Sequence, residues 1–98
     1  MTEEEEEQAA LSAVVRGVVQ AVGFRQFAIV HARALDLTGY VRNGNDGRSV
    51  EIVAEGARTA LEEMVRRLWK GPFMARVDSV QVRWAPPSGE FARFEARF

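Results

Sequence analysis

The hydrophobic residues of this chain follow two different periods. Val80, Val82 and Trp84 alternate with polar residues, a pattern typical of a strand with one buried face. Another set of residues recurs every three or four positions, as on one side of a helix: Phe24, Phe27, Ala28, His31 and Leu35. Together the patterns predict helices at 24–35 and 57–68 and strands at 11–15, 39–43, 49–55, 80–84 and 94–98.

Glycine, asparagine and proline separate these stretches. The segment 44–47 is short and rich in turn residues, so the strands on either side of it should form a hairpin. A second turn is expected at 86–89. The element order is then β-α-β-β-α-β followed by an edge strand. Two right-handed β-α-β units that share a hairpin give a ferredoxin-like α+β sandwich, with an antiparallel sheet and two helices on one face.

The composition is that of one small globular domain, with 98 residues of which 47% are hydrophobic and 28% charged. No uncharged apolar run approaches the roughly 18 residues of a membrane-spanning helix, so no membrane partner is expected. The chain has no cysteine, which excludes disulfides, thiolate zinc sites and a cysteine nucleophile, and favours a cytoplasmic protein. We expect a monomer with an acidic flexible tail at 1–9 and a folded domain at 10–98.

The formal net charge of −1 is unevenly distributed along the chain. Five glutamates at 3–7 repel one another and favour a solvated tail, the alternative being a tail that binds a partner. Without them, 13 basic residues face nine acidic ones, a net charge of +4. This mild positive charge suits a small anionic ligand and is too weak to indicate nucleic-acid binding.

The connection at 17–23 joins the first strand to the first helix and has glycine at both ends. Exposed loop amides and the free N–H groups of a helix N-terminus can together bind an anion. The spacing is not that of a Walker A loop or of a dinucleotide-binding motif. Arg25 follows in the first helical turn, where a cation opposes the helix dipole unless an anion binds between them. A planar guanidinium suits phosphate, the alternative being an ordinary solvent-exposed arginine.

These residues resemble a motif of the acylphosphatase family, small ferredoxin-like enzymes with the loop sequence glycine-x-Val-Gln-Gly-Val-x-Phe-Arg. Residues 17–25 of this chain read Gly-Val-Val-Gln-Ala-Val-Gly-Phe-Arg. A second family motif, Gly-aromatic-x-x-Asn followed four residues later by glycine, is matched by Gly39, Tyr40, Asn43 and Gly47. The resemblance covers nearly all of the chain after the acidic tail.

The resemblance implies hydrolysis of the carboxyl–phosphate bond of an acyl phosphate, giving a carboxylate and inorganic phosphate. Arg25 and Asn43 are then the expected catalytic residues, Arg25 holding the phosphoryl group and Asn43 the attacking water. The expected phosphate-binding residues are Val19, Gln20, Ala21, Val22, Gly23 and Arg25. The resemblance implies no metal, no cofactor and no covalent intermediate, and its only expected partner is a small-molecule acyl phosphate.

Two features depart from the family pattern. Ala21 stands where the family has glycine, directly in the expected phosphate loop, and alanine is strained there if φ is positive. The turn around Gly47 is one residue longer than usual, which we expect to alter only the hairpin. Asn43, next to Gly44, would otherwise be an ordinary turn residue.

Other functions remain as alternatives. Ala21 supports a catalytically weak or inactive phosphate- or anion-binding domain of the same fold. An RNA-recognition module shares the strand order, but the strands at 11–15 and 49–55 have no aromatic residue on which bases could stack. His31 is the single histidine and shares the apolar side of the first helix, so we expect it to pack rather than act as a base or metal ligand.

Overall fold

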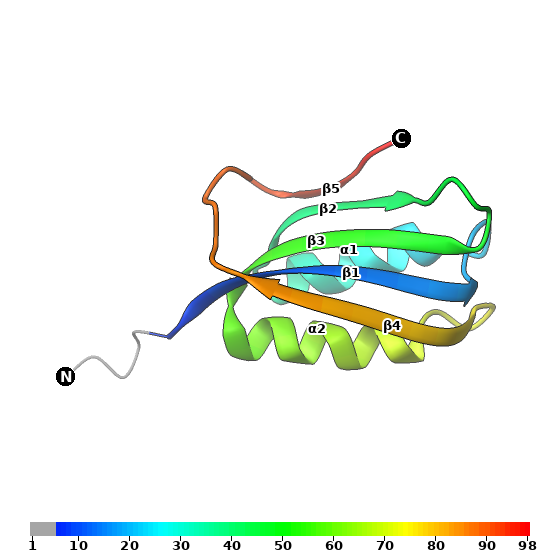
Figure 1. The fold of residues 1–98 in the computed structure, drawn as a ribbon, viewed down its shortest axis with the longest axis horizontal. Coiled ribbons are helices and arrows are strands. Elements are labelled where there is room, and N and C mark those ends of the chain that lie inside the picture. The colour runs from blue at the N-terminus through cyan, green and yellow to red at the C-terminus, as the bar shows by residue number, and fades with distance from the viewer. Residues whose placement is uncertain (1–5) are drawn as a thin grey trace.

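The computed structural model describes residues 6–98, which form a five-stranded sheet and two helices (Figure 1). The strands are β1 (Gln8–Val18), β2 (Thr38–Asn43), β3 (Ser49–Ala57), β4 (Arg76–Ala85) and β5 (Phe94–Ala96), and the helices are α1 (Phe24–Ala34) and α2 (Arg58–Lys70). Residues 1–5, which contain most of the predicted acidic tail, lie outside the described residues. No helix of the described part of the chain is long and apolar enough to span a bilayer.

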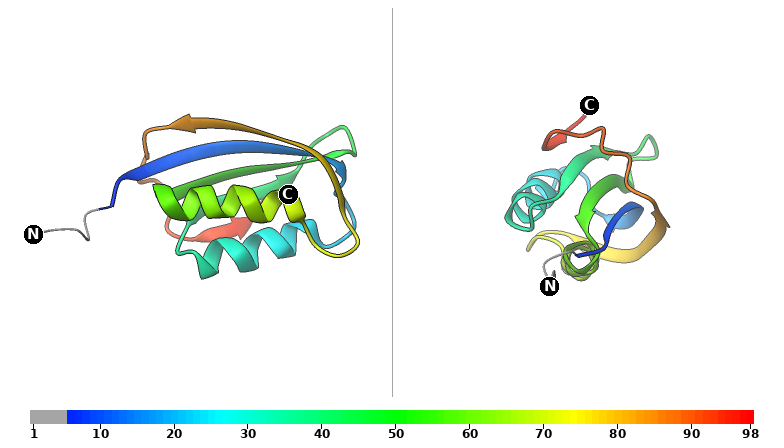
Figure 2. Two further views of the ribbon diagram at one scale, coloured as in Figure 1. Left: turned by 90° about the horizontal axis from the view of Figure 1, so that it is seen from below. Right: turned by 90° about the vertical axis from the view of Figure 1, so that its left-hand side faces the viewer.

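The sheet has the order β4-β1-β3-β2-β5. The pairs β1–β4, β1–β3 and β2–β3 are antiparallel, and the short β5 lies parallel to β2 at one edge. Both helices cover the same face of the sheet (Figure 2). Strands β1 to β4 and the two helices form the ferredoxin-like α+β sandwich that the sequence predicts, and β5 extends it as a parallel edge strand.

The core lies between the sheet and the helices. Helix α2 buries Leu61, Met64 and Leu68, which are three or four positions apart and therefore lie on one side of the helix. These residues belong to one buried cluster with Leu11 of β1 and Ile52 of β3. Each large apolar side chain buried in this way stabilises the fold by about 1.5–3 kcal/mol. The core therefore fixes the central strands, from which the loop before α1 emerges.

The first strand is longer than the sequence predicts. It begins at Gln8, because Gln8 and Ala9 pair with Ala57 and Gly56 at the end of β3. Ala9 is also buried. The folded domain therefore begins before residue 10, and the predicted tail at 1–9 is too long at its C-terminal end.

Candidate active site

The loop that follows β1 is defined by two glycines with different roles. At Gly17 the pairing of β1 with β4 is irregular, and a Cβ on this residue would overlap the carbonyl oxygen of Arg76. Glycine is needed there because the two backbones approach closely. At the other end, Gly23 has a φ of 82° and is the N-cap of α1. This left-handed conformation also favours glycine, so the loop is confined between two positions that other residues would strain.

The N-terminus of α1 is open to an anion. Gly23 offers no side chain that could accept hydrogen bonds from the first-turn amides, and the first turn contains no acidic residue. Such free N–H groups give the start of a helix a partial positive charge. Arg25 lies in the same turn, so two sources of positive charge meet at this end of α1.

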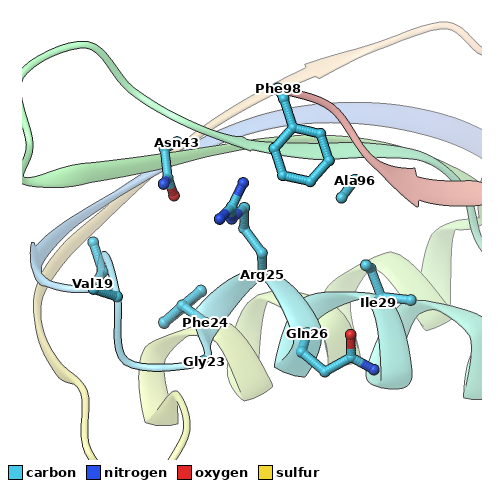
Figure 3. Close-up of a pocket in the computed structure, with 10 residues that line it drawn as sticks. Val19, Gly23, Phe24, Arg25, Gln26, Ile29, Asn43, Ala96 and Phe98 are labelled. Carbon is cyan, nitrogen blue, oxygen red and sulfur yellow. The ribbon is translucent and has the colours of Figure 1, made fainter.

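A pocket with a volume of about 260 Å³ opens beside this helix end (Figure 3). Its walls come from the loop, α1, the end of β2, β5 and the residue that lies two positions after β5: Val19, Ala21, Gly23, Phe24, Arg25, Gln26, Ile29, Asn43, Ala96 and Phe98. The pocket therefore brings together both predicted catalytic residues, Arg25 and Asn43, with part of the predicted phosphate loop.

Arg25 lies at the centre of the pocket, with its guanidinium directed toward Asn43 and Phe98 (Figure 3). The guanidinium carbon is 4.8 Å from the centroid of the Phe98 ring, which is a cation–π distance. None of the ion pairs within residues 6–98 involves Arg25. Its charge is therefore not neutralised by a carboxylate of the described chain.

Asn43 ends β2, where it pairs with Val50 of β3. The amide of Gly44 donates to the carbonyl oxygen of Ser49 at 2.9 Å and closes the hairpin directly behind Asn43. The Asn43 side chain points toward the space in front of the Arg25 guanidinium (Figure 3). Strand pairing thus positions this asparagine at the pocket.

Gln20 ties the loop to the hairpin, a role that its sequence pattern did not reveal. Its side-chain nitrogen Nε2 donates to the carbonyl oxygens of Gly44, at 2.9 Å, and Ser49, at 2.8 Å. Gln20 and Val22 are not among the residues that line the pocket, and Val22 packs against the core. The structure therefore does not bring these two predicted phosphate-binding residues to the pocket. The one sequence feature that could have indicated the role of Gln20 is its polar side chain within an otherwise apolar segment, 18–22.

Both departures from the family pattern can be located. Ala21 lines the pocket with a φ of 60°, so the positive φ considered for this position is confirmed. The longer turn lies outside the pocket, where Asp46 accepts hydrogen bonds from the amide of Arg48 at 2.9 Å and from Oγ of Ser49 at 2.8 Å. The turn belongs to the hairpin and does not line the pocket, whereas Ala21 lies in the loop itself.

Five pocket residues were not predicted as part of the site: Phe24, Gln26, Ile29, Ala96 and Phe98. Ile29 lies one helical turn after Arg25. Ala96 and Phe98 continue the alternation that begins at the buried Phe94. This alternation was visible in the sequence, but its place beside the pocket depends on the parallel pairing of β5 with β2.

His31 lies outside the pocket and packs between the helices, as expected. Its ring centroid is 4.3 Å from that of Phe27, and its Nδ1 is 3.1 Å from a guanidinium nitrogen of Arg67. Burial, and to a smaller extent the Arg67 charge, hold the pKa of His31 below its ordinary value of 6.5. Within residues 6–98, no group of three or more histidine, aspartate or glutamate side chains could hold a metal ion.

The chain is similar in sequence and structure to proteins of one family. Residues 11–96 match the acylphosphatase family. An acylphosphatase of Thermobifida fusca is 50% identical over 91 residues, which cover 93% of this chain and 99% of that protein. The crystal structure of the Bacillus subtilis acylphosphatase has a TM-score of 0.87 at 34% identity, covering 92% of this chain and 99% of the other. An acylphosphatase structure from Coxiella burnetii has a TM-score of 0.88 at 33% identity, covering 99% and 100%. This chain belongs to the acylphosphatase family, whose members hydrolyse acyl phosphates.

Proposed function

We propose that this enzyme binds the phosphoryl group of an acyl phosphate between the amides of loop 19–23 and Arg25, and that Asn43 holds the water that attacks phosphorus. The observation that carries this proposal is that Arg25 and Asn43 line one pocket at the N-terminus of α1, where no side chain caps the helix. The guanidinium and the free amides together supply positive charge and hydrogen bonds for a phosphoryl group.

The chemistry of an acyl phosphate needs little more than these groups can supply. Attack by water forms a new P–O bond while the bond between phosphorus and the acyl oxygen breaks, releasing a carboxylate and inorganic phosphate. The carboxylate leaves without being protonated, so no general acid is required. Catalysis then consists of positioning the reactants and stabilising charge on the phosphoryl oxygens.

The proton of the attacking water needs an acceptor. The amide oxygen of Asn43 can orient the water through a hydrogen bond but cannot take its proton near neutral pH. Among the described residues that line the pocket, no side chain is a histidine, an aspartate or a glutamate. The proton therefore passes to an oxygen of the substrate's own phosphoryl group.

Two substitutions separate phosphate binding from attack by water. Arg25→Ala should lower kcat/KM for benzoyl phosphate about 10³-fold, because a main charged contact with the transition state is lost. It should also abolish inhibition by inorganic phosphate.

Asn43→Ala should lower kcat about 10²-fold through misplacement of the water and leave phosphate inhibition nearly unchanged. Arg83→Ala, at an exposed arginine of β4, is the matched control and should alter neither quantity. A chelator should not change the rates.

The alternative is a phosphate-binding domain with weak or no activity, and the strained Ala21 in the loop favours it. This alternative predicts stabilisation by phosphate without hydrolysis of benzoyl phosphate above its spontaneous rate. Hydrolysis that persists in Arg25→Ala would contradict the role proposed for the arginine. Loss of phosphate inhibition in Asn43→Ala would contradict the separation of roles.

A further inference from the structure

Two groups of residues line the pocket on either side of Arg25. The loop and Asn43 lie on one side of the arginine, and Gln26, Ile29, Ala96 and Phe98 lie on the other (Figure 3). These last three residues are referred to below as the apolar wall. We propose that the apolar wall binds the acyl group of the substrate and makes the enzyme selective for acyl phosphates of apolar, and especially aromatic, carboxylic acids. This proposal rests on the proposed function of the same pocket.

The direction of the reaction places the acyl group at the apolar wall. In phosphoryl transfer the attacking and leaving oxygens lie roughly in line through phosphorus. With the water at Asn43 and the phosphoryl group beside Arg25, the leaving oxygen points away from Asn43. The apolar wall lies on that side, because Ile29 follows Arg25 by one helical turn and the Phe98 ring lies against the guanidinium.

Phe98 offers an unused aromatic surface at this position. The residue is 100% exposed although its ring contacts Arg25. A planar acyl group placed against this ring and against Ile29 would remove apolar surface of both partners from water. Ala96, on β5, is small and leaves room between the larger side chains. An aromatic acid therefore gains more from this wall than an acetyl group can.

The apolar wall offers no partner for a second negative charge on the acid. Arg25 is the one cationic side chain among the described pocket residues, and the phosphoryl group occupies it in the proposed complex. The neighbouring arginines are engaged elsewhere: Arg33 donates to the carbonyl oxygen of Phe94 at 3.1 Å, and Arg97 lies 4.0 Å from the centroid of the Tyr40 ring. A second carboxylate on the acid would lose water without gaining an ion pair.

The first test compares benzoyl phosphate with acetyl phosphate, which carry the same phosphoryl group and differ only in the acid. Phe98→Ala should lower the benzoyl-to-acetyl ratio of kcat/KM about tenfold, equivalent to about 1.4 kcal/mol. Hydrolysis of acetyl phosphate should fall less than that of benzoyl phosphate, because the acetyl group makes little use of the ring. Phe73→Ala removes a phenylalanine that is 97% exposed in the α2–β4 connection, and as the matched control it should leave the ratio unchanged.

A second substitution tests the wall by changing its preference rather than weakening it. Phe98→Lys places a cation where the acyl group is proposed to bind. The ratio of kcat/KM for succinyl phosphate, whose acid carries a second carboxylate, to that for benzoyl phosphate should then rise. An equal loss of activity toward all three substrates in Phe98→Ala and Phe98→Lys would mean that the ring only holds Arg25 in place, and would overturn the proposal.

Binding of stable analogues separates this proposal from the proposed function. In phenacylphosphonate and acetonylphosphonate a methylene replaces the oxygen that links the acyl group to phosphorus, so neither can be hydrolysed at that bond. Tighter binding of the phenacyl compound, lost in Phe98→Ala, supports the apolar wall even if no acyl phosphate is hydrolysed. Equal binding of the two analogues by an enzyme that hydrolyses benzoyl phosphate would reject the wall and leave the proposed function standing.

Discussion

Ala21 has a left-handed backbone, with a φ of 60°, in the loop that borders the pocket. This conformation is about 1–2 kcal/mol less favourable for a residue with a Cβ than a right-handed one. The neighbouring residues oppose relaxation of the loop, because Val19 is buried in the core and the Gln20 side chain is bonded to the hairpin. The loop therefore retains a shape that suits glycine while carrying alanine.

The substitution Ala21→Gly should relieve this strain. We expect the free energy of unfolding to rise by about 0.5–1 kcal/mol, since the strain relieved exceeds the extra entropy that glycine gives the unfolded chain. Removal of a methyl group that lines the pocket should also tighten phosphate binding or raise kcat for benzoyl phosphate, without changing which acids are accepted. Urea unfolding and steady-state kinetics measure the two effects separately.

Asp36→Gly is the matched control for this substitution. Asp36 is the other described non-glycine residue with a positive φ, 59°, and lies between α1 and β2, outside the pocket. Aspartate tolerates this conformation better than alanine, so a smaller gain in stability is expected, with unchanged kinetics. If Ala21→Gly changes stability alone, as Asp36→Gly should, the methyl group does not crowd the ligand.

At the scale of elements, local sequence patterns predict the helices better than the ends of the strands. Helix α1 is predicted at 24–35 and observed at Phe24–Ala34. The early start of β1 could not be predicted, because Ala9 and Ala10 have little strand preference and extend the strand through pairing with β3. Strand ends depend on which partner is present, whereas helix ends depend mainly on neighbouring residues.

The same distinction applies to the site. Arg25 and Asn43 lie in motifs with recognisable local sequence, and both line one pocket. Their catalytic roles stay predictions. Ala96 and Phe98 have no such motif. They reach the pocket because β5 crosses to the far edge of the sheet and pairs in parallel with β2, a long-range arrangement that alternation alone does not specify.

The link between the loop and the hairpin gives a prediction at this scale. Gln20→Leu removes the donor shared by the carbonyl oxygens of Gly44 and Ser49. Loss of these bonds should lower the free energy of unfolding by about 1–3 kcal/mol. It should also lower kcat/KM for benzoyl phosphate about tenfold, since the loop and Asn43 are no longer held in register.

Gln81→Leu serves as the control, because Gln81 lies exposed on β4 and its side chain accepts a hydrogen bond only from Arg16 among the described residues. It should change stability by less than about 0.5 kcal/mol and leave the kinetics unaltered. If Gln20→Leu lowers stability but not kcat/KM, the two bonds support the fold and do not position Asn43.

At the scale of the whole molecule, the pocket couples ligand binding to folding. Its walls come from α1, β2, β5 and the loop after β1, so the complete pocket exists only in the folded chain. A ligand that binds only the folded state, at 100 times its dissociation constant, stabilises it by about 2.7 kcal/mol. Phosphate should therefore raise the midpoint of thermal unfolding when compared with chloride at matched ionic strength. Arg25→Ala should abolish this rise and Arg83→Ala should preserve it.

The connection between β4 and β5 crosses from one edge of the sheet to the other, and Glu55 of β3 holds it in the middle. Its carboxylate accepts hydrogen bonds from Oγ of Ser88 at 2.6 Å, from the amide of Ser88 at 3.1 Å and from the amide of Gly89 at 3.0 Å. Burial by itself raises the pKa of Glu55, but these bonds favour the charged form and bring the pKa below its ordinary value of 4.5. One buried carboxylate thus fixes the path that leads to β5 and Phe98.

This carboxylate should make stability depend on pH. Because the folded-state pKa of Glu55 is lower than the unfolded value, the unfolded chain binds more protons between the two values, and stability is lost as pH falls below about 4.5. Glu55→Gln presents an NH₂ group to donors and should lower the free energy of unfolding at pH 7 by about 2 kcal/mol. The decline of the free energy of unfolding between pH 5 and pH 3 should become shallower. The remaining decline is due to groups such as Asp46 and Glu63, whose pKa values are also lowered.

Glu51→Gln is the control, because it breaks only the exposed pair with Arg42, and it should lower the free energy of unfolding by less than about 1 kcal/mol. Urea unfolding across this pH range measures both variants, and an unchanged slope in Glu55→Gln would show that the Ser88–Gly89 contact is not the source of the pH dependence.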